Sequence, residues 1–135
     1  MSSLGKSRGK PITKVQFERI VKQFITFAKR ELKITHNVPI YFVDDANFAK
    51  NVKAFGEISE TDMIHVSIIN RHPMDILRTL GHELEHYKQH MVKGVPKHHS
   101  HAGDPIENQA NAKAGELLRK FGALHPEYFD LTAIK

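Results

Sequence analysis

The chain has 135 residues, of which 26% are charged and 40% hydrophobic, so it can form one compact domain with a core but not two. It contains no cysteine, which excludes disulfides, thiolate zinc sites and cysteine nucleophiles. No apolar run reaches the length of a membrane span and no apolar block stands near the N-terminus, so we expect a cytoplasmic protein that does not engage a membrane.

The net charge of +5 is concentrated near the N-terminus. Residues 1–33 contain nine Lys or Arg and two Glu, whereas residues 34–135 carry a net charge of −2. We expect residues 1–13 to form a flexible basic arm and residues 14–135 to form a single domain. The basic segment could contact nucleic acid or another polyanion, or it could serve only as a solubilising tail beside a solvated helix face.

Residues 15–32 are predicted to form an amphipathic helix, because apolar side chains recur at helical spacing among lysines and arginines. The apolar positions are Val15, Ile20, Phe24, Phe27 and Leu32. A β-branched and aromatic run over residues 38–43 then predicts a strand.

Residues 52–58 and 63–69 predict two further strands, and the four residues between them predict a hairpin. Gly56 indicates a bulge or a close approach of the backbone to a neighbour. Apolar and polar residues alternate along 63–69, so one face of this strand is buried and His65 lies on the other face rather than in a site.

The segment from Pro73 to Val92 is the most informative, because its helical pattern separates two faces. The apolar face comprises Ile76, Leu77, Leu80, Leu84, Tyr87 and Met91. His82 and His86 are four residues apart on the opposite side, so their imidazoles stack one turn above the other and can reach one ion. Glu83 is offset by one residue, where it can act on a water molecule without binding the ion itself. In the H-E-x-x-H pattern two histidines bind zinc and the glutamate is the general base.

A histidine-rich loop and a final helix follow. His98, His99 and His101 lie close together, a composition typical of metal binding or of a proton-transferring loop. Asp104 suits an N-cap and Pro105 a first helical position. The apolar stripe of this helix is Ile106, Ala110, Ala114, Leu117 and Phe121, and Gly122 is expected to end it. The last residues are expected to pack back on the body.

A catalytic zinc ion usually has three protein ligands, so a third must accompany His82 and His86. Glu107, on the separate final helix, could approach from the side, although it also stands where a capping-box glutamate would bond back to Asp104. One of the three loop histidines is a second choice. His90 is the least suitable, because three ligands in a row on one helix cannot easily surround an ion. Asn111 lies one turn after Glu107 and could hydrogen-bond a ligating histidine.

Two segments carry a resemblance to a known family. His82-Glu83-Leu84-Glu85-His86, followed by Ile106-Glu107-Asn108-Gln109-Ala110-Asn111, is similar to the motifs of small gluzincin zinc peptidases of the ImmA/IrrE kind. The likeness implies that His82, His86 and Glu107 bind zinc, that Glu83 is the base, and that strand 63–69 is the edge strand that pairs with an extended peptide. No DNA-binding helix-turn-helix of that family fits here. The histidine loop resembles SprT-like proteases, whose third ligand is a histidine.

These observations predict an α+β protein with a minimal zincin-like fold: an N-terminal helix, a small mixed or antiparallel sheet of about three strands, the H-E-x-x-H helix and a second ligand-bearing helix. The expected function is that of an endopeptidase that holds one Zn²⁺ ion and acts on proteins or peptides. His98, His99, His101 and Tyr128 are candidates for stabilising the oxyanion. The alternatives are a non-catalytic binding or structural protein on the same scaffold, whose basic segment contacts nucleic acid or a partner, and a protease acting on nucleic-acid-bound proteins.

Overall fold

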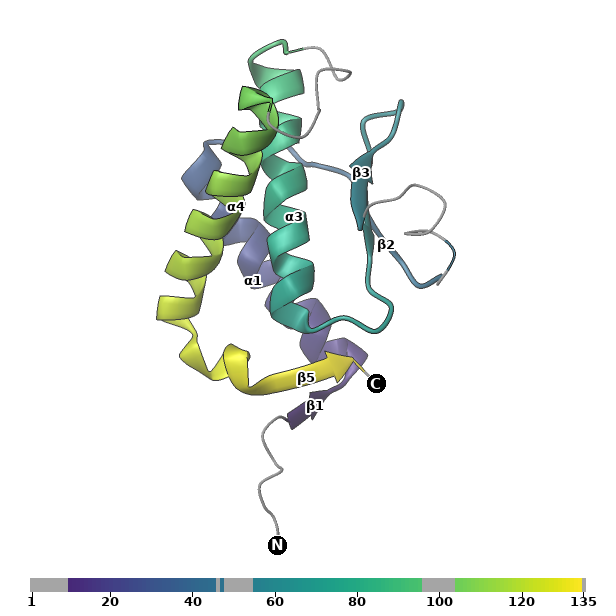
Figure 1. Cartoon of the computed structure of the whole chain (residues 1–135). Helices are drawn as coiled ribbons and strands as arrows, with labels where there is room; N and C mark the ends of the chain where they lie inside the picture. Colours follow the sequence, from purple (N-terminus) through teal and green to yellow (C-terminus); the bar gives the residue numbers. More distant parts are fainter. Residues whose placement is uncertain (1–9, 46, 48–54, 96–103, 135) are drawn as a thin grey trace, which may run out of the picture.

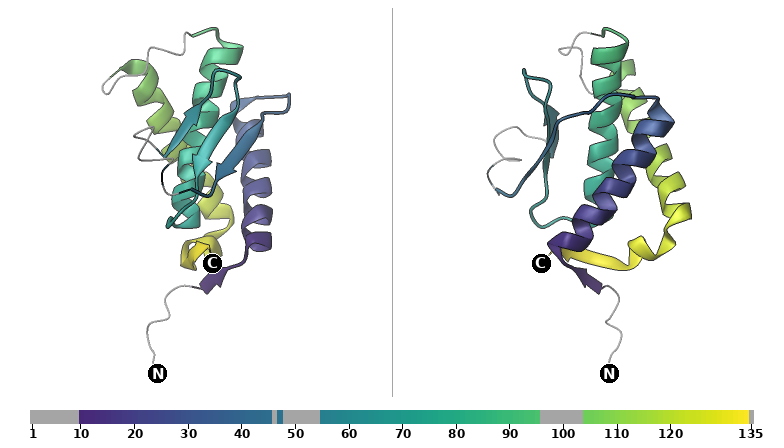
Figure 2. Two further views of the ribbon diagram at one scale, coloured as in Figure 1. Left: turned by 90° about the vertical axis from the view of Figure 1, so that its right-hand side faces the viewer. Right: turned by 180° about the vertical axis from the view of Figure 1, so that it is seen from behind.

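Three α-helices lie on the same side of a small three-stranded sheet, with α3 next to the sheet and α4 beyond it, as Figures 1 and 2 show. The computed structural model describes residues 10–45, 47, 55–95 and 104–134. The helices are α1 (Lys14–Leu32), α3 (Pro73–Tyr87) and α4 (Pro105–Leu124), and the strands of the sheet are β2 (Ile40–Val43), β3 (Gly56–Ile58) and β4 (Ile64–Ser67). The α+β class expected from the sequence is confirmed.

The sheet is mixed, and β4 is its central strand. β4 pairs in parallel with β2, with Ile40 opposite Ile64, and antiparallel with β3, with Ile58 opposite Ile64. The expectation that strand 63–69 is the edge strand is therefore wrong. The hairpin accounts for one side of β4, but β2 occupies the other side, so β3 is the edge beside α3 in the described part of the chain.

Helix α1 begins where a capping box forms. The Thr13 hydroxyl accepts from the Gln16 amide, and the Gln16 side chain accepts from the Thr13 amide. The buried face includes Phe17 and Val21 and continues through Phe24, which is fully buried. Val15 was expected in this face but is 65% exposed, because it lies two residues before Phe17 and so almost on the opposite side of the helix.

Helix α3 is the central helix, and its regular winding ends at Tyr87. The apolar stripe from Ile76 to Tyr87 is buried as expected. From Lys88 to Val92 the chain forms a π-helical turn, η2. Because a π turn holds more residues than an α turn, it shifts the phase of the helix. Met91, expected in the stripe, is 46% exposed, and Gln89 is buried in its place.

Helix α4 runs antiparallel to α3 and packs closely against it (Figure 1). Gly81 of α3 lies at this contact, where a Cβ atom would be at an ordinary van der Waals distance of 3.6 Å from Cα of Ala114. Gly122 does not end α4 as expected, since the helix continues to Leu124. A Cβ at Gly122 would lie 2.3 Å from the ring of Phe129, so the glycine makes room for the segment that folds back.

The two ends of the described chain meet at the foot of α1. Strand β1 (Lys10–Ile12) pairs in parallel with β5 (Leu131–Ile134), which follows the 3-10 turn η4 (Pro126–Asp130). The sequence predicts a flexible arm through residue 13, but its last residues form this strand and Ile12 is only 2% exposed. The earlier part of the arm lies outside the described residues.

None of the described helices combines the length and the hydrophobicity that crossing a lipid bilayer requires.

Candidate metal centre and adjoining cleft

His82, His86 and Glu107 bring three ligand atoms to one point between α3 and α4. The two Nε2 atoms are 3.1 Å apart, Glu107 Oε1 is 2.8 Å from His82 Nε2, and Glu107 Oε2 is 3.2 Å from His86 Nε2. Tetrahedral ligands at the usual zinc bond lengths are separated by about 3.3 Å. The three side chains therefore have the spacing that a single divalent ion requires, and no other such group occurs in the described residues.

The buried side chain of Gln89 fixes the orientation of the His86 imidazole. Its Nε2 donates to the Ile106 carbonyl at 3.1 Å and to Gln109 Oε1 at 2.9 Å, so its Oε1 must be the atom that faces His86 Nδ1 at 2.8 Å. Nδ1 of His86 then carries the proton and donates it to Gln89. The lone pair of Nε2 is left facing the cluster, as metal binding requires.

Glu107 points into the cluster rather than back to its own helix cap. Asp104 caps α4 by accepting from the Ile106 amide at 2.8 Å, and the Glu107 carboxylate contacts the two histidines. Asn111, one turn later, lies close enough to His82 for a side-chain hydrogen bond, which tends to raise the pKa of that imidazole. Burial, and then the neighbouring His86, lower the pKa of His82, which favours the neutral form that can bind a cation.

Glu83 lies outside the ligand cluster and faces β3. It is 7% exposed, and a Cβ at Gly56 would lie 3.0 Å from Glu83 Cγ, so the glycine allows the edge strand to approach the carboxyl group. The close approach that Gly56 indicates in the sequence is confirmed. Burial, followed by the charges of Glu107 and Glu57, raises the pKa of Glu83 to about 8. A cation nearby would favour the charged form of this group.

A cleft of about 270 Å³ adjoins the cluster on the N-terminal side of α3. Residues of β3, α3 and α4 and the segments beside them line it: Phe55, Gly56, Arg71, Asp75, Arg78, Thr79, His82, Glu83, Asn111 and Ala114. A larger hollow of about 560 Å³ lies between α1 and β2, but no member of the metal cluster lines it. We therefore regard the smaller cleft as the part of the surface that belongs to the site.

Other residues predicted for the site lie elsewhere. The His90 ring stacks on His86 at 5.8 Å, and its Nδ1 donates to the Val95 carbonyl at 2.7 Å, so it supports the cluster without joining it. Tyr128 was a candidate for the oxyanion, which is wrong: it follows the opposite end of α4, stacks on His125 and donates to Gln23. His98, His99 and His101 lie outside the described residues. His65 lies opposite Glu57 in the β3–β4 pair, with its Nδ1 3.8 Å from the Glu57 carboxylate.

The sequence does not single out two residues that the structure places at the candidate site. Gln89 follows His86 by three residues, a spacing that places it beside the ligand, but its bonds to α4 depend on the tertiary fold. Arg78 precedes His82 by four residues and therefore shares its helix face.

No family model matches this chain, and no curated protein or solved structure was found to be similar to it.

Proposed function

We propose that this chain is a zinc-dependent metallopeptidase that hydrolyses peptide bonds. The observation that carries the proposal is the convergence of His82, His86 and Glu107, with the Glu83 carboxyl group on the adjoining turn and a cleft beside it. The resemblance of the two helix motifs to gluzincin peptidases supports the same conclusion. Glu107 takes the third ligand position in the proposal, in preference to a loop histidine.

The chemistry of the three donors favours zinc. Two imidazole nitrogens and one carboxylate are a ligand set of catalytic zinc sites, whereas calcium and magnesium prefer oxygen ligands alone. Three protein ligands leave one position for water or substrate. A zinc ion held there would polarise the scissile carbonyl and lower the pKa of a water molecule towards neutrality.

The remaining steps are assigned to groups of the protein. Glu83 accepts a proton from the attacking water and passes it to the leaving amine. Its buried position beside Gly56 holds the carboxyl group between α3 and the edge strand, so little reorientation is needed. Gln89 orients the His86 imidazole through a hydrogen bond, and Asn111 does the same for His82. The substrate is placed in the cleft alongside β3, whose outer edge is unpaired in the described residues.

The test combines metal content with turnover. The purified protein is expected to bind one zinc ion per chain by mass spectrometry, and a fluorogenic peptide library is expected to be cleaved only by the zinc-loaded form. Glu83→Gln should retain the ion and lose cleavage by at least about a hundredfold, as expected for loss of a general base.

Glu18→Gln is the matched control, because Glu18 is exposed on α1 and makes the same change of charge. If Glu83→Gln cleaves the library as fast as the parent protein, the role assigned to Glu83 is wrong. If the protein binds zinc but cleaves no peptide under any condition, the non-catalytic alternative on this scaffold is supported instead.

A further inference from the structure

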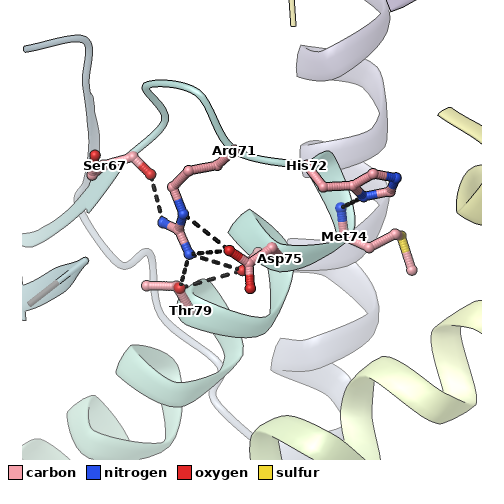
Figure 3. A network of polar contacts seen from close by, with 6 residues as sticks. All are labelled: Ser67, Arg71, His72, Met74, Asp75 and Thr79. Atoms are coloured by element: carbon pink, nitrogen blue, oxygen red, sulfur yellow. Dashed lines mark hydrogen bonds and ion pairs between the residues drawn. The ribbon is translucent and has the colours of Figure 1, made fainter. Parts of the chain in front are cut away.

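The cleft beside the metal centre contains two arginines that differ in their partners. Arg71 is buried and donates to the Ser67 carbonyl, the Asp75 carboxylate and the Thr79 hydroxyl, as Figure 3 shows. Its guanidinium also lies over the ring of Phe55, at 4.3 Å from the centroid. Arg71 therefore holds the loop before α3 in place, and with only 4% of its side chain exposed it presents little surface to a ligand.

Arg78 lines the same cleft but is exposed, and it makes no hydrogen bond or ion pair with any residue that the structure describes. Asp75, three residues earlier on the same helix, is already paired with Arg71 at 3.0 Å. The carboxyl group of Glu83 is buried against β3. Among the described residues, none accepts from the five N–H donors of this guanidinium, which lies at the wall of a concave surface where an incoming anion would complete its hydrogen bonds.

We propose that Arg78 binds a carboxylate of the substrate and gives the enzyme a preference for acidic peptides. This inference rests on the proposed peptidase function and deepens it, because it names the substrate class. The planar guanidinium can form two parallel hydrogen bonds with a carboxylate, which a lysine cannot do.

The position of Arg78 limits where the acidic residue lies in the substrate. Arg78 is four residues from His82, about 6 Å along the axis of α3. An extended peptide advances about 3.3 Å per residue. The carboxylate held by Arg78 therefore belongs to a residue about two positions from the scissile bond, or to a free C-terminus at that distance.

Binding is measured with zinc-loaded Glu83→Gln protein, so that the peptide is not consumed. The probes are fluorescent octapeptides of one neutral host sequence, in which a single Glu or Gln is moved through every position and the C-terminus is either amidated or free. We expect the best Glu peptide to bind about tenfold more tightly than its Gln partner, the worth of one charge-assisted pair. Comparing the amidated with the free peptides distinguishes a side-chain carboxylate from a terminal one.

Arg78→Gln should remove this tenfold preference and leave the affinity for the Gln peptides unchanged. Arg78→Lys should keep part of it, and Arg78→Glu should reverse it in favour of a lysine peptide. Arg119→Gln, on the exposed face of α4 outside the cleft, is the control and should bind every peptide like the parent.

Two negative results have different meanings. If Glu and Gln peptides bind equally well, or if Arg78→Gln keeps the full preference, Arg78 is a solvated surface residue and the inference is overturned. If no peptide binds to Glu83→Gln and none is cleaved by the parent protein, the proposed function itself fails.

Discussion

The burial of Glu83, the proposed general base, predicts that its carboxyl group destabilises the metal-free protein. In the folded chain its pKa is raised to about 8, mainly by burial, whereas the unfolded chain has the ordinary value near 4.5. Between these values the folded state holds a proton that the unfolded state releases, so the free energy of unfolding falls as the pH rises. Glu83→Gln removes the titrating group and with it this loss.

The size of this loss of stability follows from the difference between the pKa of Glu83 in the folded and in the unfolded chain. Stability changes by about 1.4 kcal/mol per pH unit across the window, and the gradual titration at both ends leaves about 3.5 kcal/mol between pH 5 and pH 8. With a typical urea m-value, this corresponds to a shift of roughly 1–3 M in the unfolding midpoint. The variant that abolishes turnover is thus expected to be the more stable protein at pH 8, an exchange of stability for function.

The assay is urea unfolding in the presence of a strong chelator, at pH 5 and pH 8, for the parent, Glu83→Gln and the control Glu18→Gln. Comparing the pH dependence of stability of each variant with that of the parent isolates the contribution of Glu83, because the histidines contribute equally in all three proteins. We expect the parent and Glu18→Gln to lose stability in parallel and Glu83→Gln to lose about 3.5 kcal/mol less. Parallel curves for all three proteins would refute the reasoning, since the carboxyl group would then ionise without cost.

Three further predictions concern positions that support the site or the fold. Gln89→Ala should weaken zinc binding by about 10–100-fold in competition with a chromophoric chelator, because the imidazole loses its acceptor, and unchanged affinity would contradict this role. Gly56→Ala should keep zinc but lower turnover at least about tenfold, since its methyl group would lie 3.0 Å from the general base; full activity would show that the edge strand can move. Gly122→Ala should change stability in urea by less than about 1 kcal/mol, because its Cβ would lie 2.3 Å from the exposed ring of Phe129, which can turn away, and alanine is the better helix former; a loss above about 2 kcal/mol would show that the ring is held in place.

Local patterns were sufficient to predict the helices and the placement of His82 and His86 on one helix face. The apolar spacing from Ile76 to Tyr87 and the cap at Asp104 depend on neighbours in sequence, so α3 and the start of α4 were placed correctly. The pair His82 and His86 follows from the same periodicity. Glu107 could not be separated from a capping glutamate until the two helices were seen side by side.

Features that depend on distant partners were missed or misplaced. The π turn at η2 removed Met91 from the core, and no local signal marks where an α-helix widens. β1 and β5 are short and pair across almost the whole chain, so neither stands out in sequence. The central position of β4 depends on the parallel addition of β2, which a hairpin pattern cannot indicate. Gln89 gains its role from Ile106 and Gln109, which the fold brings beside it.

The central claim is that a single zinc ion is held between α3 and α4, and anomalous diffraction at the zinc edge tests it most directly. A crystal grown with one equivalent of zinc is expected to show one strong anomalous peak about 2.1 Å from His82 Nε2, His86 Nε2 and a carboxylate oxygen of Glu107. A peak coordinated instead by the loop histidines His98, His99 or His101, or no peak between the two helices, would contradict the account.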